Sequence, residues 1–81
     1  MKIKVNQVHI DNGEARNCER CPVALALQDA GLFEPSIGYS TLYAGVNRDE
    51  YEFPDVVGSK ILAFDDGLGM EPFEFKIKKV R

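Results

Sequence analysis

The segment "NCERCPVALALQDAG", residues 17–31, decides the fold because it predicts a helix that is apolar on most of its sides. Pro22 suits the first helical position, where a missing N–H leaves no hydrogen bond unmade. The apolar residues recur at helical spacing and form a wide stripe: Val23, Ala24, Leu25, Ala26, Leu27 and Ala30. Gly31 is a natural helix end. We therefore expect this helix at the centre of the fold.

The two ends of the chain predict strands. In "KIKV", residues 2–5, the isoleucine and the valine share one face and the two lysines share the other, which is typical of a half-buried strand. In "PFEFKIKKV", residues 72–80, the same alternation points Phe73, Phe75 and Ile77 inward.

The middle of the chain predicts a hairpin and a second main helix. Residues 37–46 indicate one strand, "NRDE" a loop, and residues 51–53 a short return strand. Residues 54–67 then predict a helix that begins at Pro54 or Asp55 and ends at Gly67. Its Gly58 weakens a helix by roughly 1 kcal/mol relative to alanine.

Together these elements predict a single α+β domain over residues 1–81. A short helical turn between Asn6 and Gly13 precedes the first main helix. Without that turn the order is βαββαβ, the ferredoxin-like arrangement, in which both main helices cover one face of an antiparallel sheet. We expect the first and last strands to be neighbours. The alternative is an irregular sheet of three or four strands with the same helices.

Composition excludes some classes of function. The net charge of −3 disfavours general affinity for nucleic acid, which requires a basic surface. The N-terminus lacks the pattern of a signal peptide, and no apolar run approaches membrane-spanning length. We expect a cytoplasmic protein whose two cysteines are reduced.

The pair Cys18 and Cys21 permits three interpretations. A thiol at a helix N-terminus is stabilised as thiolate, so the pair could be a redox dithiol. With His9 and a fourth ligand from a carboxylate or a second subunit, the cysteines could bind zinc. The favoured interpretation is that both are small, largely buried packing residues, because free cysteine is among the most buried residue types. No cofactor is then required, and His9 is expected at the surface near a helix end.

A cluster of lysines is the first candidate binding surface. If the terminal strands are adjacent, one solvent face carries Lys2, Lys4, Lys76 and Lys78, and the patch is extended by Lys79 and Arg81. Such a face could bind an acidic protein surface, a phosphorylated ligand or a nucleotide. The alternative is a solvated face that keeps an open sheet soluble.

The tyrosines of the hairpin are the second candidate surface. Tyr39 and Tyr43 are expected on one face of the strand over residues 37–46, and Tyr51 follows in the return strand. Tyrosine offers a large contact area at low entropic cost, which suits an interface. The acidic "DEYEFPD" segment favours self-association or a partner of mixed charge. The alternative is that the tyrosines lie flat along the sheet.

Four segments carry a resemblance: "HIDNG" at 9–13, CxxCPVALAL at 18–27, "FDDG" at 64–67 and "PFEF" at 72–75. They resemble a group of small uncharacterised proteins found in phages, prophages and their bacterial hosts. The resemblance implies a cytosolic accessory protein and supplies no catalytic residues.

The leading hypothesis is a non-enzymatic, phage-type accessory protein that binds and modulates a host protein through the tyrosine hairpin and sheet face. A metal-binding or redox protein centred on the cysteines, and a binder of phosphorylated ligands on the lysine face, are the alternatives. A homo-oligomer is a further expectation; membrane binding is not expected.

Overall fold

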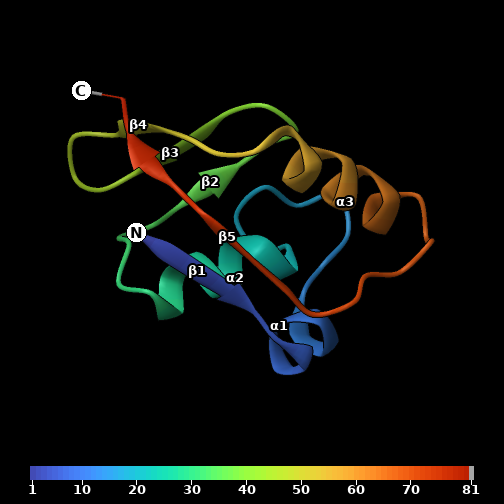
Figure 1. Cartoon of the computed structure of the whole chain (residues 1–81). Helices are drawn as coiled ribbons and strands as arrows, with labels where there is room; N and C mark the ends of the chain where they lie inside the picture. The colour runs from blue at the N-terminus through green and yellow to red at the C-terminus, as the bar shows by residue number, and fades with distance from the viewer. Residues whose placement is uncertain (81) are drawn as a thin grey trace.

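The computed structural model describes residues 1–80 and is an α+β fold, as expected (Figure 1). Arg81, which was expected to extend the lysine patch, lies outside the described residues. The elements in chain order are β1 (Lys2–Val5), α1 (Gln7–Asn12), α2 (Pro22–Asp29), β2 (Ser36–Ile37), β3 (Leu42–Ala44), β4 (Asp49–Glu52), α3 (Asp55–Asp65), β5 (Phe73–Lys76) and β6 (Lys78–Lys79).

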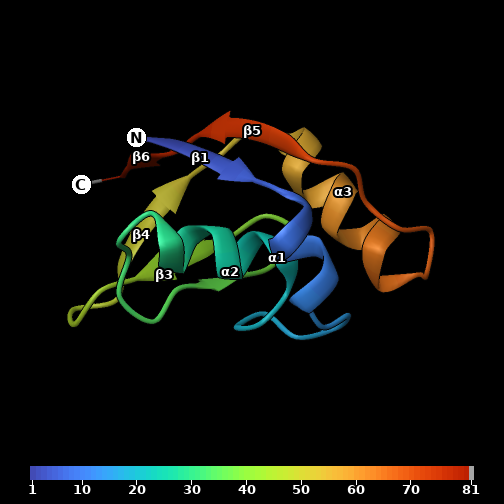
Figure 2. The ribbon, with the colours of Figure 1, turned by 90° about the horizontal axis from the view of Figure 1, so that it is seen from below.

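Helix α2 is the buried centre that its sequence predicts. Pro22 is its first residue, and Gly31 beyond its end has a φ of +102°, a conformation that glycine adopts at little cost. Five of its eight residues are buried: Pro22, Val23, Ala24, Ala26 and Leu27. It packs against β1, β2 and α1 (Figure 2). The hydrophobic core is therefore assembled around α2.

The strands form two antiparallel sheets where one was expected. One pairs β1 with β5, so the first and last strand segments are neighbours, as predicted. The other has the order β2-β3-β4-β6. Residues 73–79, which form β5 and then β6, thus connect the sheet of β1 to the sheet of the hairpin. The ferredoxin-like order is not confirmed.

Ile77 is the point at which the last strand changes partner. Its N–H donates to the Met1 carbonyl at 2.8 Å, which continues the ladder of β1 and β5. The next two residues, Lys78 and Lys79, pair instead with Glu52 and Tyr51 of β4. Because the Ile77 side chain is buried in the core, the strand can bend here without exposing apolar surface.

The expected strand over residues 37–46 is wrong, because it is folded into two strands. The Gly38 N–H donates to the Thr41 carbonyl at 2.8 Å, which closes a tight turn between β2 and β3. Tyr39 lies in this turn and does not share a strand face with Tyr43. The predicted loop at "NRDE" is confirmed in part, since residues 45–48 connect β3 to β4.

Helix α3 begins and ends where predicted, between Pro54 and Gly67. It lies to one side of the sheets, at the end remote from the N-terminus, so the two main helices do not lie together on one sheet face (Figures 1 and 2). Gly58 allows α3 to approach the β2–β3 turn closely: a Cβ at Gly58 would lie 1.8 Å from the Tyr39 carbonyl oxygen. The glycine that weakens the helix is thus required by packing.

We expect Gly58→Ala to destabilise the protein by about 2 kcal/mol or more, because the methyl group would overlap backbone that cannot move independently. Helix propensity alone predicts a gain of about 1 kcal/mol. Urea unfolding measures the difference, with Ser59→Ala at the neighbouring exposed position as the control that should change stability by only a few tenths. A Gly58→Ala variant more stable than wild type would contradict the packing assigned to this position.

Candidate functional site

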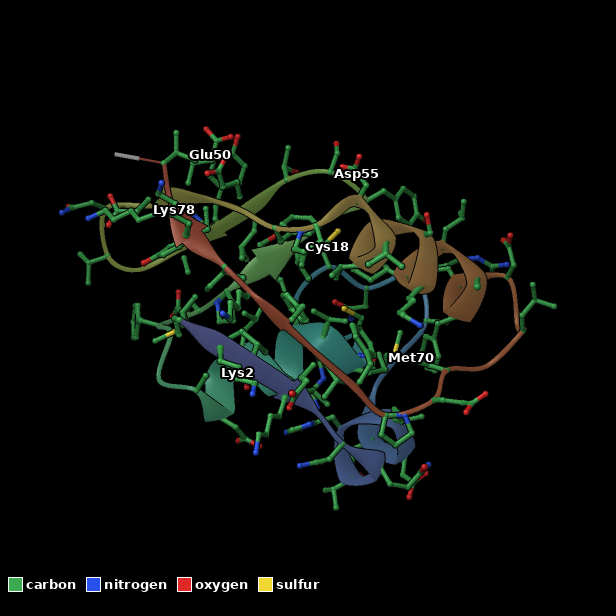
Figure 3. The ribbon with its side chains drawn as sticks, viewed as in Figure 1. Lys2, Cys18, Glu50, Asp55, Met70 and Lys78 are labelled. Atoms are coloured by element: carbon green, nitrogen blue, oxygen red, sulfur yellow. The ribbon has the colours of Figure 1, made fainter. Side chains whose placement is uncertain are left out.

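The turn that carries the cysteines borders a cavity of about 320 Å³. Figure 3 places Cys18 between β2 and α3, where this cavity lies. Three separate parts of the chain line it: the loop before α2, the β2–β3 turn and α3. The lining residues are Arg16, Asn17, Cys18, Cys21, Ile37, Gly38, Tyr39, Ile61 and Asp65.

Asp65 holds these three segments together. Its side chain is buried, with 8% of the residue exposed. Oδ1 accepts a hydrogen bond from the Arg16 backbone N–H, and Oδ2 accepts one from the Tyr39 hydroxyl, each at 2.7 Å. Hydrogen bonds to a charged carboxylate are roughly twice as strong as neutral ones. The sequence assigned Asp65 only to a helix end, because its partners are 49 and 26 residues away.

Tyr39 is held by this carboxylate and is therefore not a free contact residue. The hydrogen bond to Asp65 raises the pKa of the Tyr39 phenol, because a phenolate would lose the bond and meet a negative charge. Its ring remains about half exposed at the edge of the cavity. The predicted placement of Tyr39 on a strand face with Tyr43 is wrong, and its binding role stays a prediction.

The two cysteines have different environments. Cys21 is 1% exposed and is the N-cap of α2, where its Sγ accepts from the Ala24 N–H at 3.4 Å. Burial raises the pKa of the Cys21 thiol, which opposes the thiolate form that redox chemistry needs. The predicted burial is confirmed for Cys21 and wrong for Cys18, which is exposed.

His9 is buried, although it was expected at the surface. Its Nδ1 accepts from the Asn6 N–H at 3.0 Å, so the proton must be on Nε2, which contacts the Asp29 carboxylate. Both ring nitrogens are thus engaged, and His9 does not join the cysteines. Within residues 1–80, no three His, Cys, Asp or Glu side chains are grouped to hold a metal ion, and the zinc hypothesis lacks a ligand set there.

The predicted lysine face is divided between the two sheets. Lys2 lies opposite Lys76 and Lys4 lies opposite Glu74, whose carboxylate pairs with the Lys2 ammonium at 3.0 Å. That hydrogen bond and the charges of Lys2 and Lys4 lower the pKa of Glu74. Lys78 lies on the other sheet, opposite Glu52 and, in Figure 3, near Glu50. Three of the four lysines therefore lie on the two-stranded sheet, and Lys78 lies on the four-stranded one.

The exposed side of the four-stranded sheet is a different surface, here called the outer sheet face. Tyr43 lies opposite Glu50, and Glu52 lies opposite Lys78. The Val80 N–H donates to the Glu50 carbonyl at 2.9 Å, which adds a residue to this edge. The outer sheet face comprises Tyr43, Glu50, Glu52, Lys78 and Val80, all of which are exposed.

Tyr51 faces the opposite way from Tyr43. It is paired with the buried Leu42 and is itself half-buried against the core. Its predicted binding role stays a prediction, for a side chain that is only partly accessible. The sequence did not indicate this, because the predicted loop at residues 47–50 implies a different hairpin register from the observed pairing of Tyr51 with Leu42. Of the three tyrosines, Tyr43 is the one on an exposed sheet face.

In comparisons with known proteins, no family model, no curated protein and no solved structure matches the chain. The resemblance to small phage and prophage proteins stays a prediction. In the part of the chain that the structure describes, no helix combines the length and the apolar character needed to cross a membrane.

We expect Asp65→Ala to lower the free energy of unfolding by about 1.5–3 kcal/mol, since it removes two charge-assisted hydrogen bonds that join distant segments. Thermal or urea unfolding measures the loss. Asp66→Ala is the matched control, because Asp66 is the exposed neighbour. Equal stability of the two variants would show that Asp65 does not hold the cavity walls together.

Proposed function

We propose that this chain is a non-catalytic binding protein that docks on another protein through the outer sheet face. The observation that carries the proposal is Tyr43, which is 37% exposed on a regular strand and shares its sheet face with two glutamates and exposed Val80. None of the elements described in residues 1–80 buries this face. A solvent-facing sheet surface that retains aromatic and aliphatic side chains is typical of an interaction site.

The strand prepares Tyr43 for binding. Its backbone is fixed by pairing on both sides, with Ser36 of β2 and Glu50 of β4. A partner that covers the ring therefore meets a side chain whose main chain is already ordered. Ordering a flexible residue reduces affinity. A contact residue that is already ordered therefore retains more of the free energy gained by burying its side chain.

Charge indicates the chemistry of the partner. Glu50 and Glu52 on the outer sheet face outnumber its single cation, Lys78 (Figure 3). Two copies of this face would bring glutamates together, which opposes a symmetric homo-oligomer at this site. A protein with a basic rim around an apolar patch is complementary, and we expect salt to slow its association.

Two features support binding over catalysis. Cys21 is an interior helix cap, and both nitrogens of His9 already have partners, so neither side chain is free to act as nucleophile or base. The resemblance to phage and prophage proteins suggests a bacterial host protein as the partner, in the cytoplasm, with modulation of that host protein as the outcome.

A pull-down from bacterial lysate with the tagged full chain tests the proposal. We expect Tyr43→Ser to reduce recovery of the partner at least tenfold, because it removes the largest apolar contact of the face while leaving an exposed position that tolerates serine. Glu50→Lys should also reduce recovery of the partner, and this loss should be larger at low salt than at high salt.

Lys4→Glu on the two-stranded sheet is the matched control, since it changes one exposed charge far from Tyr43 in the strand order. It should leave recovery unchanged. If Lys4→Glu abolishes recovery while Tyr43→Ser does not, binding occurs on the lysine-bearing sheet and the assignment to the outer sheet face is wrong.

A further inference from the structure

We infer that the cavity beside Asp65 binds a small aromatic molecule with a hydrogen-bond-donating head group, an amine or a hydroxyl. This inference is independent of the proposed protein-binding role, because it uses none of the outer-sheet-face residues. It rests on the size of the cavity, its apolar walls and the direction of its hydrogen-bonding groups.

The cavity is large enough for such a molecule. An apolar protein cavity of about 150 Å³ accommodates benzene. The volume of about 320 Å³ beside Asp65 therefore has room for one ring with a short substituent, at the lower end of the range for ligand sites.

Apolar side chains supply part of the wall. Ile37, Ile61 and Cys21 line the cavity and are otherwise buried in the core, with at most 3% of each residue exposed. Because so little of these three residues is exposed, the area that a bound ring can cover comes mainly from the Tyr39 ring and Cys18, which are exposed and line the same cavity. The gain is about 25 cal/mol for each Å² of apolar surface removed from water.

The polar groups that face the ring select a donor. Asp65 Oδ1 and Oδ2 each accept one hydrogen bond from the protein and retain a further lone pair. The Tyr39 hydroxyl has given its only hydrogen to Asp65, so its oxygen can only accept from a ligand. The Arg16 N–H is likewise committed to Asp65. An amine or a hydroxyl can donate to these acceptors, whereas a carboxylate placed beside Asp65 would meet a like charge. Arg16 and Asn17 also line the cavity and carry N–H donors, so the selection rests on contact with Asp65 and Tyr39.

The site is formed before any ligand arrives. In residues 1–80, every buried side-chain nitrogen or oxygen has a hydrogen-bond partner, so the Asp65 and Tyr39 side of the cavity is held by hydrogen bonds within the protein. Cys18 also lines the cavity, and its exposed thiol gives a chemical report of occupancy.

Titration with benzylamine, benzyl alcohol and benzoate tests the inference. Binding is followed by two-dimensional NMR of the backbone amides and by the rate at which Cys18 reacts with a disulfide reagent. We expect benzylamine and benzyl alcohol to shift amides of residues 16–18, 38–39 and 61–65 and to slow the Cys18 reaction at least threefold. Benzoate should do neither.

Variants separate this site from general surface binding. Tyr39→Phe removes one acceptor and should weaken benzyl alcohol about tenfold, the value of one hydrogen bond of about 1.4 kcal/mol. Tyr43→Phe, outside the cavity, should leave affinity unchanged. Asp65→Asn, which replaces an accepting oxygen with a donor, should weaken benzylamine more than benzyl alcohol.

Far-ultraviolet circular dichroism verifies that each variant is folded before titration. Equal binding of benzoate and benzylamine, shifts confined to residues outside the cavity, or no shift with any of the three probes would each overturn the inference.

Discussion

The burial of helix α2 is the constraint on which the rest of the structure depends. A helix with so few polar positions cannot lie on a surface, and a chain of 81 residues has little material with which to enclose it. β1 covers it on one side and β2 on another. The last strand segment then serves both sheets: β5 supports β1, and beyond the buried Ile77, β6 closes the hairpin sheet.

This arrangement explains why Cys21, the second cysteine of the CxxC segment, has a structural role. The entrance to α2 must be capped and enclosed, and Cys21 does both. Gly13 completes the enclosure by contact with the helix: a Cβ there would lie 2.5 Å from the Pro22 ring. The cavity beside Asp65 exists because the loop before α2, the β2–β3 turn and α3 meet at this entrance.

The sequence predicted what short-range patterns control. Pro22, Gly31 and Gly67 mark helix ends through backbone conformations that few other residues adopt so readily. The alternation of β1 and β5 follows from burial of one face, and the pairing of these two strands was inferred correctly. Burial of Cys21 was also expected, since it precedes the most apolar run in the chain.

What could not be predicted depends on partners distant in the chain. Nothing next to Asp65 indicates that it would bond Arg16 and Tyr39, and nothing next to His9 indicates Asp29. The change of sheet at Ile77, which separates Lys78 from the sheet of Lys76, also depends on pairing with the distant β4. The single strand expected over residues 37–46 overlooked Gly38, which permits the turn that removes Tyr39 from the sheet.

The rate of Cys21 labelling in a Cys18→Ser variant tests most directly whether the entrance of α2 belongs to the core. In the regime where opening and closing are fast, labelling under native conditions gives the free energy of the opening that exposes the thiol. We predict that this value equals the free energy of global unfolding from urea denaturation. An opening free energy lower by several kcal/mol would contradict it, because Cys21 would then be reached through a local motion of the segment on which the fold is argued to depend.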